Sequence, residues 1–576
     1  MKKYQVKTSF KEILEPEEIL LDTKERRTKD KGKLEVPIRN NIFIVVFILF
    51  IFLFTVLIAR TSQLVFREGD QMEKAAVENY LRTIYYESPR GLVYSKDGKV
   101  LVKNIKTKST KETKKAGEQK EKQYYRKYID SFHFSPIMGY TREANEEELK
   151  KDASYYESGD WVGKDGIEKE YEEYLRGKKG VRERIVDSKG KILSDRIKRQ
   201  PKIGDSVVLN IDYGLQKKIY DTIKKRVPQK DAVAIAVNPQ NGAVLALVSI
   251  PSDDNNVFSQ KKISANQLKE LQEERKIYNI NKAISAAFPA GSIIKPLIAV
   301  AALQEKVIST TTTINCIGSV TIPNPWNPKK PTIKKDNRTH GLTNLSKAIA
   351  ESCNVFFFTI GGGYKDIEGL GMNRIKKYLD SFYIEKKLNI DLPGESTGFV
   401  PTKEWFDKTQ AKRTGRNWSI ADVYDASIGQ GFFSSPPLHM AMALSSIANG
   451  GKIYQPQIVD KIKTSDGVKD IKPEVLNKGF IDDENIIKVK QAMRSCVTSP
   501  SGSCRRLQSL PVEAAGKTGT AESDKGDLTH AWFVSFAPYQ NSKIFLLVFV
   551  EYGGGGESVA EPIAKEVLDW YFKKKN

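Results

Sequence analysis

The chain has 576 residues, of which 40% are hydrophobic and 28% are charged, a balance that excludes a disordered protein and leaves room for two or more globular domains. Its 93 Lys and Arg residues exceed its 71 Asp and Glu residues, and the net charge of +22 suits an anionic membrane face as well as nucleic acid. Four cysteines are too few for a disulfide scaffold in a chain of this length.

The first predicted element is a membrane-spanning helix at 42–59, where Thr55 is the only polar residue. A helix of this length spans about 27 Å, close to the thickness of the hydrocarbon core of a bilayer. Basic residues are denser before the helix, between Lys24 and Arg39, than after it, between Arg60 and Lys74. The positive-inside rule therefore places residues 1–41 in the cytoplasm and the rest of the chain outside, behind a single-pass signal anchor.

Residues 60–205 form a polar segment with no long apolar run. Within it, residues 103–127 are rich in lysine and low in complexity, and we expect a solvated, disordered insert. A nucleic-acid partner is not expected, because an arm outside the membrane would rarely meet DNA.

Residues 206–576 carry the signals of a packed domain. Four short apolar strands are predicted in two pairs, 232–237 with 243–250 and 530–537 with 544–550. Helical patterns lie between the pairs, at 295–305 and 438–448, and a closing helix runs from about 560 to 572. We therefore predict an α+β domain whose antiparallel sheet is assembled from its two chain ends, with the helices packed around it.

Three short motifs in this domain carry chemistry. In Ser292-Ile293-Ile294-Lys295, a lysine one turn from a serine can take the hydroxyl proton and activate the nucleophile. The second motif, Ser352-Cys353-Asn354, offers a hydroxyl that can relay a proton and an amide that can hold a peptide backbone. Each pattern taken alone is weak, because the Ser292 spacing also occurs at other serines of the chain.

The third motif is Lys517-Thr518-Gly519-Thr520. Its lysine and two hydroxyls suit a carboxylate, and the glycine lets a substrate backbone lie against a strand edge. S-x-x-K with S-D-N and K-T-G is the signature of class A β-lactamases and penicillin-binding proteins, and the three motifs occur here in that order.

From about residue 90 the chain resembles a class B penicillin-binding protein of the elongation type, the penicillin-binding protein 2 family. Further stretches carry the resemblance: Arg90-Gly91-Leu92-Val93, Lys96-Asp97-Gly98, Gly163 to Lys169 with Tyr171-Glu172, His340-Gly341, Leu392-Pro393-Gly394-Glu395, Ser427 to Gly431, Ala448 to Gly451, and His530-Ala531-Trp532-Phe533. The resemblance implies a penicillin-binding fold over residues 206–576, preceded by an elongated pedestal domain over residues 60–205.

The implied activity is a serine-type D,D-transpeptidase that cross-links peptidoglycan during cell-wall elongation, with D,D-carboxypeptidase action as a side reaction. Ser292 would attack the penultimate D-Ala carbonyl of a stem peptide, and Lys295 would act as its base. Ser352 and Lys517 would handle the proton of the leaving group. The implied partners are D-Ala-D-Ala stem peptides, β-lactams, the bacterial cell membrane and a multi-pass glycosyltransferase of the SEDS type.

The same resemblance assigns the substrate contacts. Asn354 would hold the substrate amide, Thr518 and Thr520 the terminal carboxylate, and Gly519 would admit the substrate backbone. The backbone N–H groups of Ser292 and Thr520 would form the oxyanion hole.

Three alternatives stay open. The first is a division-type class B penicillin-binding protein. A β-lactamase would need a carboxylate to activate water, and Glu385 to Asn389 reads like the E-x-x-L-N loop of class A enzymes, although the membrane anchor disfavours this class. A non-catalytic sensor or scaffold is the third, and the intact Ser292 and Lys295 pair argues against it.

The cysteines suggest two smaller features. Cys316, Asp336, His340 and Cys353 have zinc-compatible side chains, and some elongation-type relatives hold a structural zinc in this region, whereas catalysis needs no cofactor. The alternative is two buried thiols, a helix-capping Asp336 and a hydrogen-bonded His340. Cys496 and Cys504 flank a tight loop and can form a local disulfide outside the membrane.

Overall fold

The computed structural model describes residues 39–106, 124–187, 191–260, 280–323 and 331–574, together with the single residues Lys189, Lys269 and Lys329. The chain divides into two compact units, Met1–Leu81 and Arg82–Asn576.

The first unit contains the apolar helix α1 (Asn40–Phe66) and the helix α2 (Gly69–Tyr80). Helix α1 is long and apolar enough to cross a membrane, and none of its residues is buried by the protein. Thr55, the polar residue of the apolar run 42–59, donates its hydroxyl to the Ile51 carbonyl oxygen, 2.7 Å away, which satisfies that group inside the helix. The prediction of one apolar segment suited to a single-pass anchor is confirmed, and the helix extends past the predicted end at Ala59.

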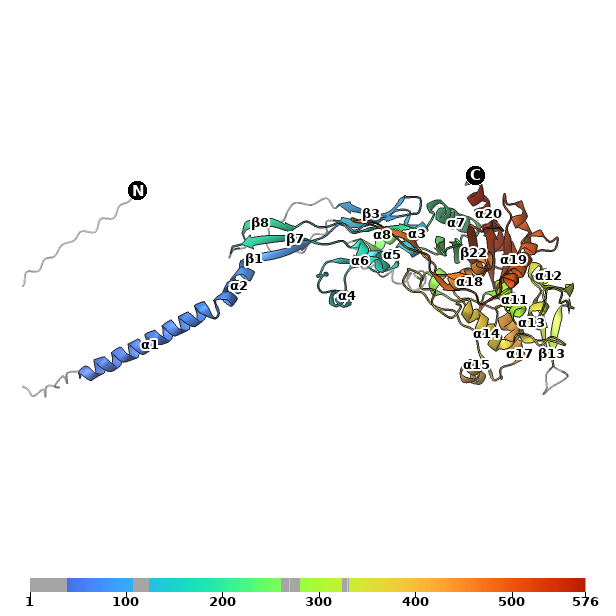
Figure 1. Ribbon diagram of the computed structural model, residues 1–576, viewed down its shortest axis with the longest axis horizontal. Helices are drawn as coiled ribbons and strands as arrows, with labels where there is room; N and C mark the ends of the chain where they lie inside the picture. Colours follow the sequence, from blue (N-terminus) through green and yellow to red (C-terminus); the bar gives the residue numbers. More distant parts are fainter. Residues whose placement is uncertain are drawn as a thin grey trace, which may run out of the picture. The chain divides into compact units, whose positions relative to one another are not determined.

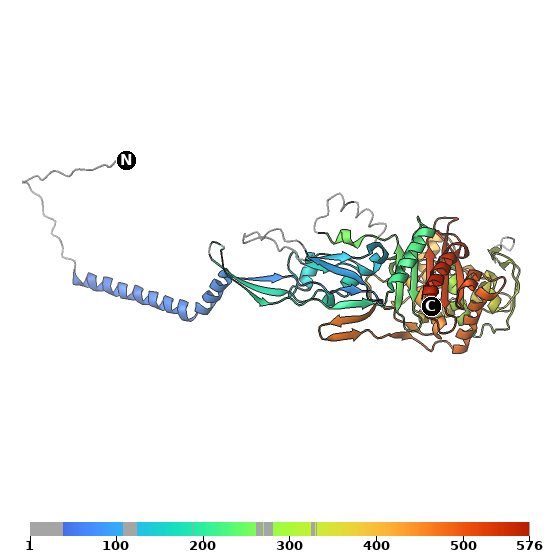
Figure 2. The ribbon, with the colours of Figure 1, turned by 90° about the horizontal axis from the view of Figure 1, so that it is seen from above.

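The second unit begins with two sheets. In the three-stranded sheet the order is β1-β7-β8, with β1 at Leu81–Tyr86, β7 at Gly180–Val186 and β8 at Ile192–Arg199. The six-stranded sheet has the order β18-β17-β9-β2-β3-β4, with β2 at Val93–Tyr94, β3 at Val100–Lys106, β4 at Tyr124–Tyr128, β9 at Ser206–Leu209, β17 at Val459–Thr464 and β18 at Gly467–Asp470. The β17–β18 hairpin therefore comes from the C-terminal half and pairs with strands of the N-terminal half (Figure 2).

This sheet corrects the sequence interpretation of 103–127. Residues 103–106 and 124–127 are not irregular, because they belong to β3 and β4, which pair antiparallel with Lys103 opposite Lys127. Buried residues such as Leu101 and Tyr128 anchor the two strands, while the lysines lie on the exposed side. Residues 107–123 of the predicted insert lie outside the described residues.

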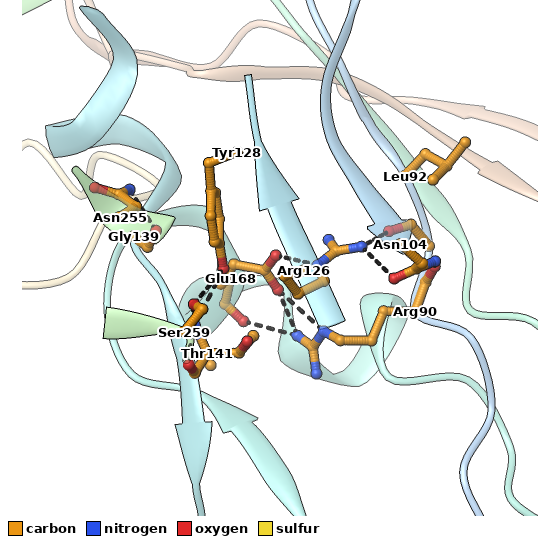
Figure 3. A network of polar contacts seen from close by, with 12 residues as sticks. Arg90, Leu92, Asn104, Arg126, Tyr128, Gly139, Thr141, Glu168, Asn255 and Ser259 are labelled. Atoms are coloured by element: carbon orange, nitrogen blue, oxygen red, sulfur yellow. Dashed lines mark hydrogen bonds and ion pairs between the residues drawn. The ribbon is translucent and has the colours of Figure 1, made fainter. Parts of the chain in front are cut away.

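A buried ion network joins two of the motifs on which the resemblance rests (Figure 3). Arg90 donates to Glu168 and Glu172, with N–O distances of 2.7 Å to each carboxylate, and Arg126 reaches Glu168 at 2.6 Å. The Glu168 side chain is fully buried, so removing it would leave the buried Arg126 guanidinium without the carboxylate that it pairs with here, a change that is strongly destabilising. The same part of the chain also contains the helices α3 (Ser131–Met138), α4 (Glu146–Lys151), α5 (Gly166–Glu170) and α6 (Glu172–Leu175) and the strand pair β5 (Thr141–Glu143) and β6 (Trp161–Gly163).

The C-terminal part is built on a five-stranded antiparallel sheet with the order β11-β10-β22-β21-β20. Its strands are β10 (Ala232–Val237), β11 (Val244–Ile250), β20 (Ala515–Glu522), β21 (Thr529–Ala537) and β22 (Ile544–Val550). The predicted α+β class and the sheet made from two chain ends are confirmed. Strand β20, which carries the third motif, is an edge strand.

Helices cover both faces of this sheet. Alternate residues of β10 point to opposite faces, so Val233 and Ile235 pack in one core and Ala234 and Ala236 in the other. The first core contains α11 (Lys295–Gln304) and α18 (Pro437–Asn449), and the second contains α7 (Tyr213–Arg226) and α20 (Glu561–Lys574). Helices α7 and α20 lie side by side (Figure 1 and Figure 2), joined by an ion pair between Lys218 and Glu566 at 2.8 Å.

Shorter elements complete this part. They are α8 (Asn255–Phe258), α10 (Lys282–Ser285), η1 (Gly291–Ile294), β12 (Ile314–Cys316), β13 (Ser319–Ile322), β14 (Thr332–Lys335), β15 (Gly341–Thr343), α12 (Leu345–Ala350), α13 (Asn354–Gly362), α14 (Gly371–Ser381), α15 (Lys403–Thr409), α16 (Ala411–Thr414), α17 (Ile420–Ser427), β16 (Ile453–Tyr454), β19 (Val475–Asn477), α19 (Asp483–Thr498), η2 (Arg505–Ser509) and η3 (Gly556–Ala560). Motif-bearing segments lie at the N-terminal ends of α11 and α13 and on β20.

Candidate active site

Ser292 lies in the short 3-10 turn η1, directly before α11. The helix predicted at 295–305 is present as α11, which begins at Lys295, three residues after Ser292. A 3-10 turn brings residues i and i+3 onto one side, so Ser292 and Lys295 still share a face. Gly291 has φ +55°, and a Cβ there would come within 2.5 Å of the Thr520 carbonyl oxygen. Glycine therefore lets the serine turn lie against the edge strand β20.

Lys295 is fully buried and points to the second motif. Its Nζ lies 2.7 Å from the Ser352 carbonyl oxygen, 2.7 Å from Asn354 Oδ1 and 3.3 Å from Ser352 Oγ. Burial lowers the pKa of Lys295 to about 8, although the negative charge of Asp336 opposes this shift. An amine with such a pKa is partly neutral near physiological pH and can accept a proton.

Ser352 occupies a strained backbone conformation with φ +61°, in the left-handed region that few residues other than glycine adopt. This conformation places its hydroxyl next to a second buried amine, Lys517 Nζ, at 2.8 Å. Burial lowers the pKa of Lys517 well below its ordinary value, and the charge of Lys295 adds to the effect. The structure thus brings the three motifs together around the Ser352 hydroxyl.

Not every predicted contact is formed. Within the described part of the chain, the Ser292 hydroxyl makes no hydrogen bond, and the bonds of Lys295 run to the 352–354 motif. The Thr518 hydroxyl lies 2.8 Å from Ser503 Oγ, while Thr520 is exposed and its Oγ1 accepts from the Gly556 N–H at 3.3 Å. Ser503 was missed by the sequence reasoning because nothing in its local pattern indicates a contact with β20.

The predicted disulfide is present between Cys496 and Cys504, with a Cα–Cα distance of 5.1 Å. It closes a loop that contacts the third motif and the residue that precedes the second. Ser501 Oγ donates to Glu351, next to Ser352, at 2.6 Å, and Ser503 reaches Thr518. The loop therefore connects the end of α12 with the edge strand β20.

The four proposed metal ligands form a compact cluster. The ligand atoms of Cys316, Asp336, His340 and Cys353 lie within 4.8 Å of one another. His340 Nδ1 lies 3.0 Å from the carboxylate of Glu351, the type of partner that orients metal-binding histidines. Sulfur, imidazole and carboxylate donors at this spacing suit a divalent ion such as zinc. This chemistry fits a metal site.

Asp336 also caps a helix, as the alternative to a metal site predicted, and this role is compatible with metal binding. Its Oδ2 also accepts the Val355 N–H at 2.8 Å, at the N-terminus of α13. Burial raises the pKa of Asp336, but the hydrogen bonds from Val355 and Asn354 outweigh burial, and the net shift is downward. Asp336 is therefore an anion that holds the helix carrying Asn354.

Glu385, the carboxylate that would activate water in a β-lactamase, forms other contacts in this structure. Glu385 forms an ion pair with Lys376 and accepts the Val400 N–H at 2.9 Å. Glu395, which follows it, accepts the Leu388 N–H at 2.6 Å. These contacts tie both carboxylates to their own loops.

Known proteins resemble this chain over most of its length. The family model described as the penicillin-binding protein transpeptidase domain matches residues 232–569, and the model of the penicillin-binding protein dimerisation domain matches residues 112–209. Peptidoglycan D,D-transpeptidase MrdA of Haemophilus influenzae is 31% identical over 481 residues, which cover 78% of this chain and 70% of that protein. MrdA of Escherichia coli K12 is 28% identical over 457 residues, 75% of this chain and 69% of the other.

Solved structures share the fold. The crystal structure of Pseudomonas aeruginosa PBP2 in complex with WCK 5153 is 28% identical, with a TM-score of 0.71 over 85% of this chain and 96% of the other. A second solved structure describes how a peptidoglycan synthase complex coordinates polymerisation and crosslinking. One of its chains is 24% identical to this chain, with a TM-score of 0.71 over 93% of this chain and 99% of the other.

A dimerisation domain followed by a transpeptidase domain with a serine–lysine site defines a class B, penicillin-binding transpeptidase. The chain belongs to the MrdA, or penicillin-binding protein 2, family of peptidoglycan D,D-transpeptidases, the elongation type.

Proposed function

We propose that the chain cross-links stem peptides through an acyl-enzyme on Ser292. The Ser292 oxygen forms a bond to the penultimate D-Ala carbonyl carbon, the peptide C–N bond breaks, and terminal D-Ala leaves with the proton that the serine gave up. An amine of a neighbouring strand then takes the acyl group and returns a proton to Ser292. The observation that carries this proposal is the meeting of Lys295 and Lys517 on the hydroxyl of Ser352.

The proton path follows from these contacts. Lys295, with a pKa of about 8, takes the Ser292 proton, since the two side chains share one face of the turn. Ser352 lies within hydrogen-bond reach of both amines, so it passes the proton toward the leaving nitrogen together with Lys517. General acid and base action of this kind contributes about 10²–10⁴-fold to a rate.

Substrate binding uses the edge of β20 and the start of α13. Asn354 holds the substrate amide, Thr518 and Thr520 hold the terminal carboxylate, and Gly519 leaves room for the substrate backbone. A Cβ on Gly519 would lie 2.8 Å from the Ile293 side chain, which explains glycine at this position. Backbone N–H groups of Ser292 and Thr520 stabilise the oxyanion, a contribution of a few kcal/mol.

The decisive test is mass spectrometry of the full chain in detergent after brief exposure to benzylpenicillin. A penicilloyl adduct mapped to Ser292, and its loss in Ser292→Ala, are expected. Ser309→Ala, an exposed serine, is the matched control and should be acylated like the wild type. An adduct on another residue would overturn the assignment.

The same measurement separates the rivals. A persistent adduct supports the transpeptidase, whereas fast turnover of penicillin would favour a β-lactamase. A growth assay tests the scaffold. In cells depleted of the wild-type protein, the Ser292→Ala variant would restore growth if the protein were a scaffold, but not if it acts as a transpeptidase.

We also propose that the Cys316, Asp336, His340 and Cys353 cluster binds zinc as a structural ion. The support is the mutual distance of the donors and the Glu351 carboxylate behind His340. A bound ion would fix Cys353, which lies between Ser352 and Asn354. No step of the reaction requires it.

The remaining proposals concern placement in the cell. Flanking charge supports a cytoplasmic N-terminus at 1–41, a span at 42–59, a pedestal at 60–205 and a transpeptidase domain at 206–576 outside the bacterial membrane. A SEDS-type glycosyltransferase is the proposed partner, supported by the fold shared with a chain of a solved peptidoglycan synthase complex.

A further inference from the structure

The outer edge of β20 is already partly occupied in the free protein. Lys517 Nζ donates to the Thr518 carbonyl oxygen at 2.8 Å. The Thr520 carbonyl oxygen accepts from Gln430 Nε2 at 3.4 Å, and the Glu522 N–H donates to Gln430 Oε1 at 3.2 Å. Because alternate residues of a strand direct their main-chain groups to the same edge, residues 518, 520 and 522 all face outward.

The Gln430 side chain is presented to this edge by a loop that the serine turn holds in place. Gly429 and Gly431 both have positive φ angles, +71° and +67°. The Gly291 N–H donates to the Gly429 carbonyl oxygen at 2.9 Å, and a Cβ on Gly429 would lie 2.6 Å from the Gly291 carbonyl oxygen. The loop is therefore fixed one residue away from Ser292, with Gln430 facing β20.

A carboxamide carries the same N–H and C=O groups as a peptide bond. An extended peptide that adds to a free strand edge uses these groups to pair with the main chain. In an antiparallel hydrogen-bonded pair, two residues exchange both of their N–H to O=C bonds. If the Thr520 N–H holds the reacting D-Ala carbonyl, the N–H of the same D-Ala faces the Thr520 carbonyl oxygen. Gln430 Nε2 occupies that position.

We propose that Gln430 is a positioning residue that stands in for the backbone amide of the donor peptide. In the free enzyme it holds the Thr520–Glu522 edge open and in register, and the donor peptide displaces it. This inference deepens the proposed function and rests on it. Gln430 touches no reacting atom in this scheme and acts through the conformation and occupancy of the β20 edge.

The lengths of the two bonds suit displacement. At 3.4 and 3.2 Å they exceed the usual N–H to O distance of about 2.9–3.0 Å, so they are weak. One net hydrogen bond is worth a factor of about two to ten in an equilibrium constant. A donor that must displace Gln430 is slowed by a factor in this range, relative to a donor that does not use the Thr520 carbonyl oxygen.

The test compares two β-lactams on the full chain in detergent. Benzylpenicillin carries an amide N–H beside the reacting carbonyl, whereas a carbapenem carries a hydroxyethyl group there. The second-order rate constant for acylation of Ser292 is measured with both, in the wild type, Gln430→Ala and Gln430→Glu. Glutamate keeps the length of the side chain but cannot donate to the Thr520 carbonyl oxygen. Gln410→Ala is the matched control, because the Gln410 side chain bonds to Thr409 and Arg413 and to no other residue that the structure describes.

In both Gln430 variants we expect the ratio of the benzylpenicillin constant to the carbapenem constant to rise about two- to tenfold. Gln410→Ala should keep the wild-type ratio. An unchanged or lower ratio in a folded Gln430 variant would overturn the inference. A wild-type chain that is not acylated at Ser292 would overturn the proposed function instead, so the two failures are distinguishable.

Discussion

Lys295 and Lys517 meet on a single oxygen atom, Ser352 Oγ, which lies 3.3 Å from the Nζ of the first and 2.8 Å from the Nζ of the second. Both amines are fully buried, and burial lowers the pKa of each. Two ammonium groups so close together would repel each other, and this repulsion favours a neutral amine in the pair. The arrangement supplies both a base and a proton relay from groups that are ordinarily cationic.

The first prediction concerns pH. Acylation needs neutral Lys295, so the acylation rate constant for benzylpenicillin should rise with pH and level off above about 8. Stopped-flow measurements from pH 6 to 10 give the profile, and Lys295→Arg should be inactive throughout. A profile that is flat or falls over this range would contradict the role of Lys295.

The same shift affects stability, with a definite sign. The pKa of Lys295 is about 8 in the folded protein and takes its ordinary value of 10.5 in the unfolded chain. Between pH 8 and pH 10.5 the unfolded chain therefore binds more protons than the folded protein. Burial of charged Lys295 lowers the free energy of unfolding by its full amount below pH 8. This destabilisation decreases as the pH rises toward 10.5. Denaturant titrations should show that Lys295→Met loses this pH dependence.

The second prediction concerns Ser352. Ser352→Ala and Ser352→Gly both remove the relay hydroxyl and should slow acylation by about 10²–10⁴-fold. They should differ in stability, because glycine adopts φ +61° without strain whereas alanine does not. Chemical denaturation should find the glycine variant more stable than the alanine variant by about 1 kcal/mol. Equal stability would mean that the backbone relaxes, and wild-type rates would exclude the relay.

The third prediction concerns the disulfide. Thiol titration of the denatured protein should find two free cysteines, Cys316 and Cys353, before reduction and four after it. Replacing Cys496 and Cys504 together by serine should lower the free energy of unfolding by about 2–3 kcal/mol, the value expected for a loop of this length. Four free thiols in the untreated protein would refute the bond.

The fourth prediction concerns metal. Protein purified without chelators should contain about one zinc ion per chain by elemental analysis. Cys316→Ser should lose the ion and melt at a lower temperature. The Cys496→Ser/Cys504→Ser double variant is the matched control and should retain it. Wild-type protein that is free of metal after zinc supplementation would argue for two plain buried thiols.

The sequence predicted the features that have strong local signals. The strands around the turn 238–242 and the strands at 530–537 and 544–550 are runs of apolar residues, and each was found where the pattern placed it. Among the residues predicted from the three motifs, Lys295 and Lys517 both lie within hydrogen-bond distance of the Ser352 hydroxyl.

The rest depends on contacts between distant segments. The β17–β18 hairpin joins β9 across about half of the chain, and the exposed residues of β18 give no hint of that pairing. Residues 103–106 and 124–127 were predicted as part of a disordered insert because their composition is rich in lysine, although they belong to β3 and β4. The left-handed Ser352 and the contacts of Ser503 and Gln430 with β20 are imposed by tertiary packing, which a single sequence does not display.

The pairing of β17 with β9 has a practical consequence for dissecting the protein. A fragment cut at residue 206 would retain both strands but strip β2 from the far side of β9, leaving an unsatisfied row of main-chain groups that invites self-association. Fragments starting at residue 82 keep that row covered. Exchanging the N-terminal half between relatives would likewise replace only some strands of this sheet. In a stable hybrid, β9 of one protein must therefore still pair with β17 of the other.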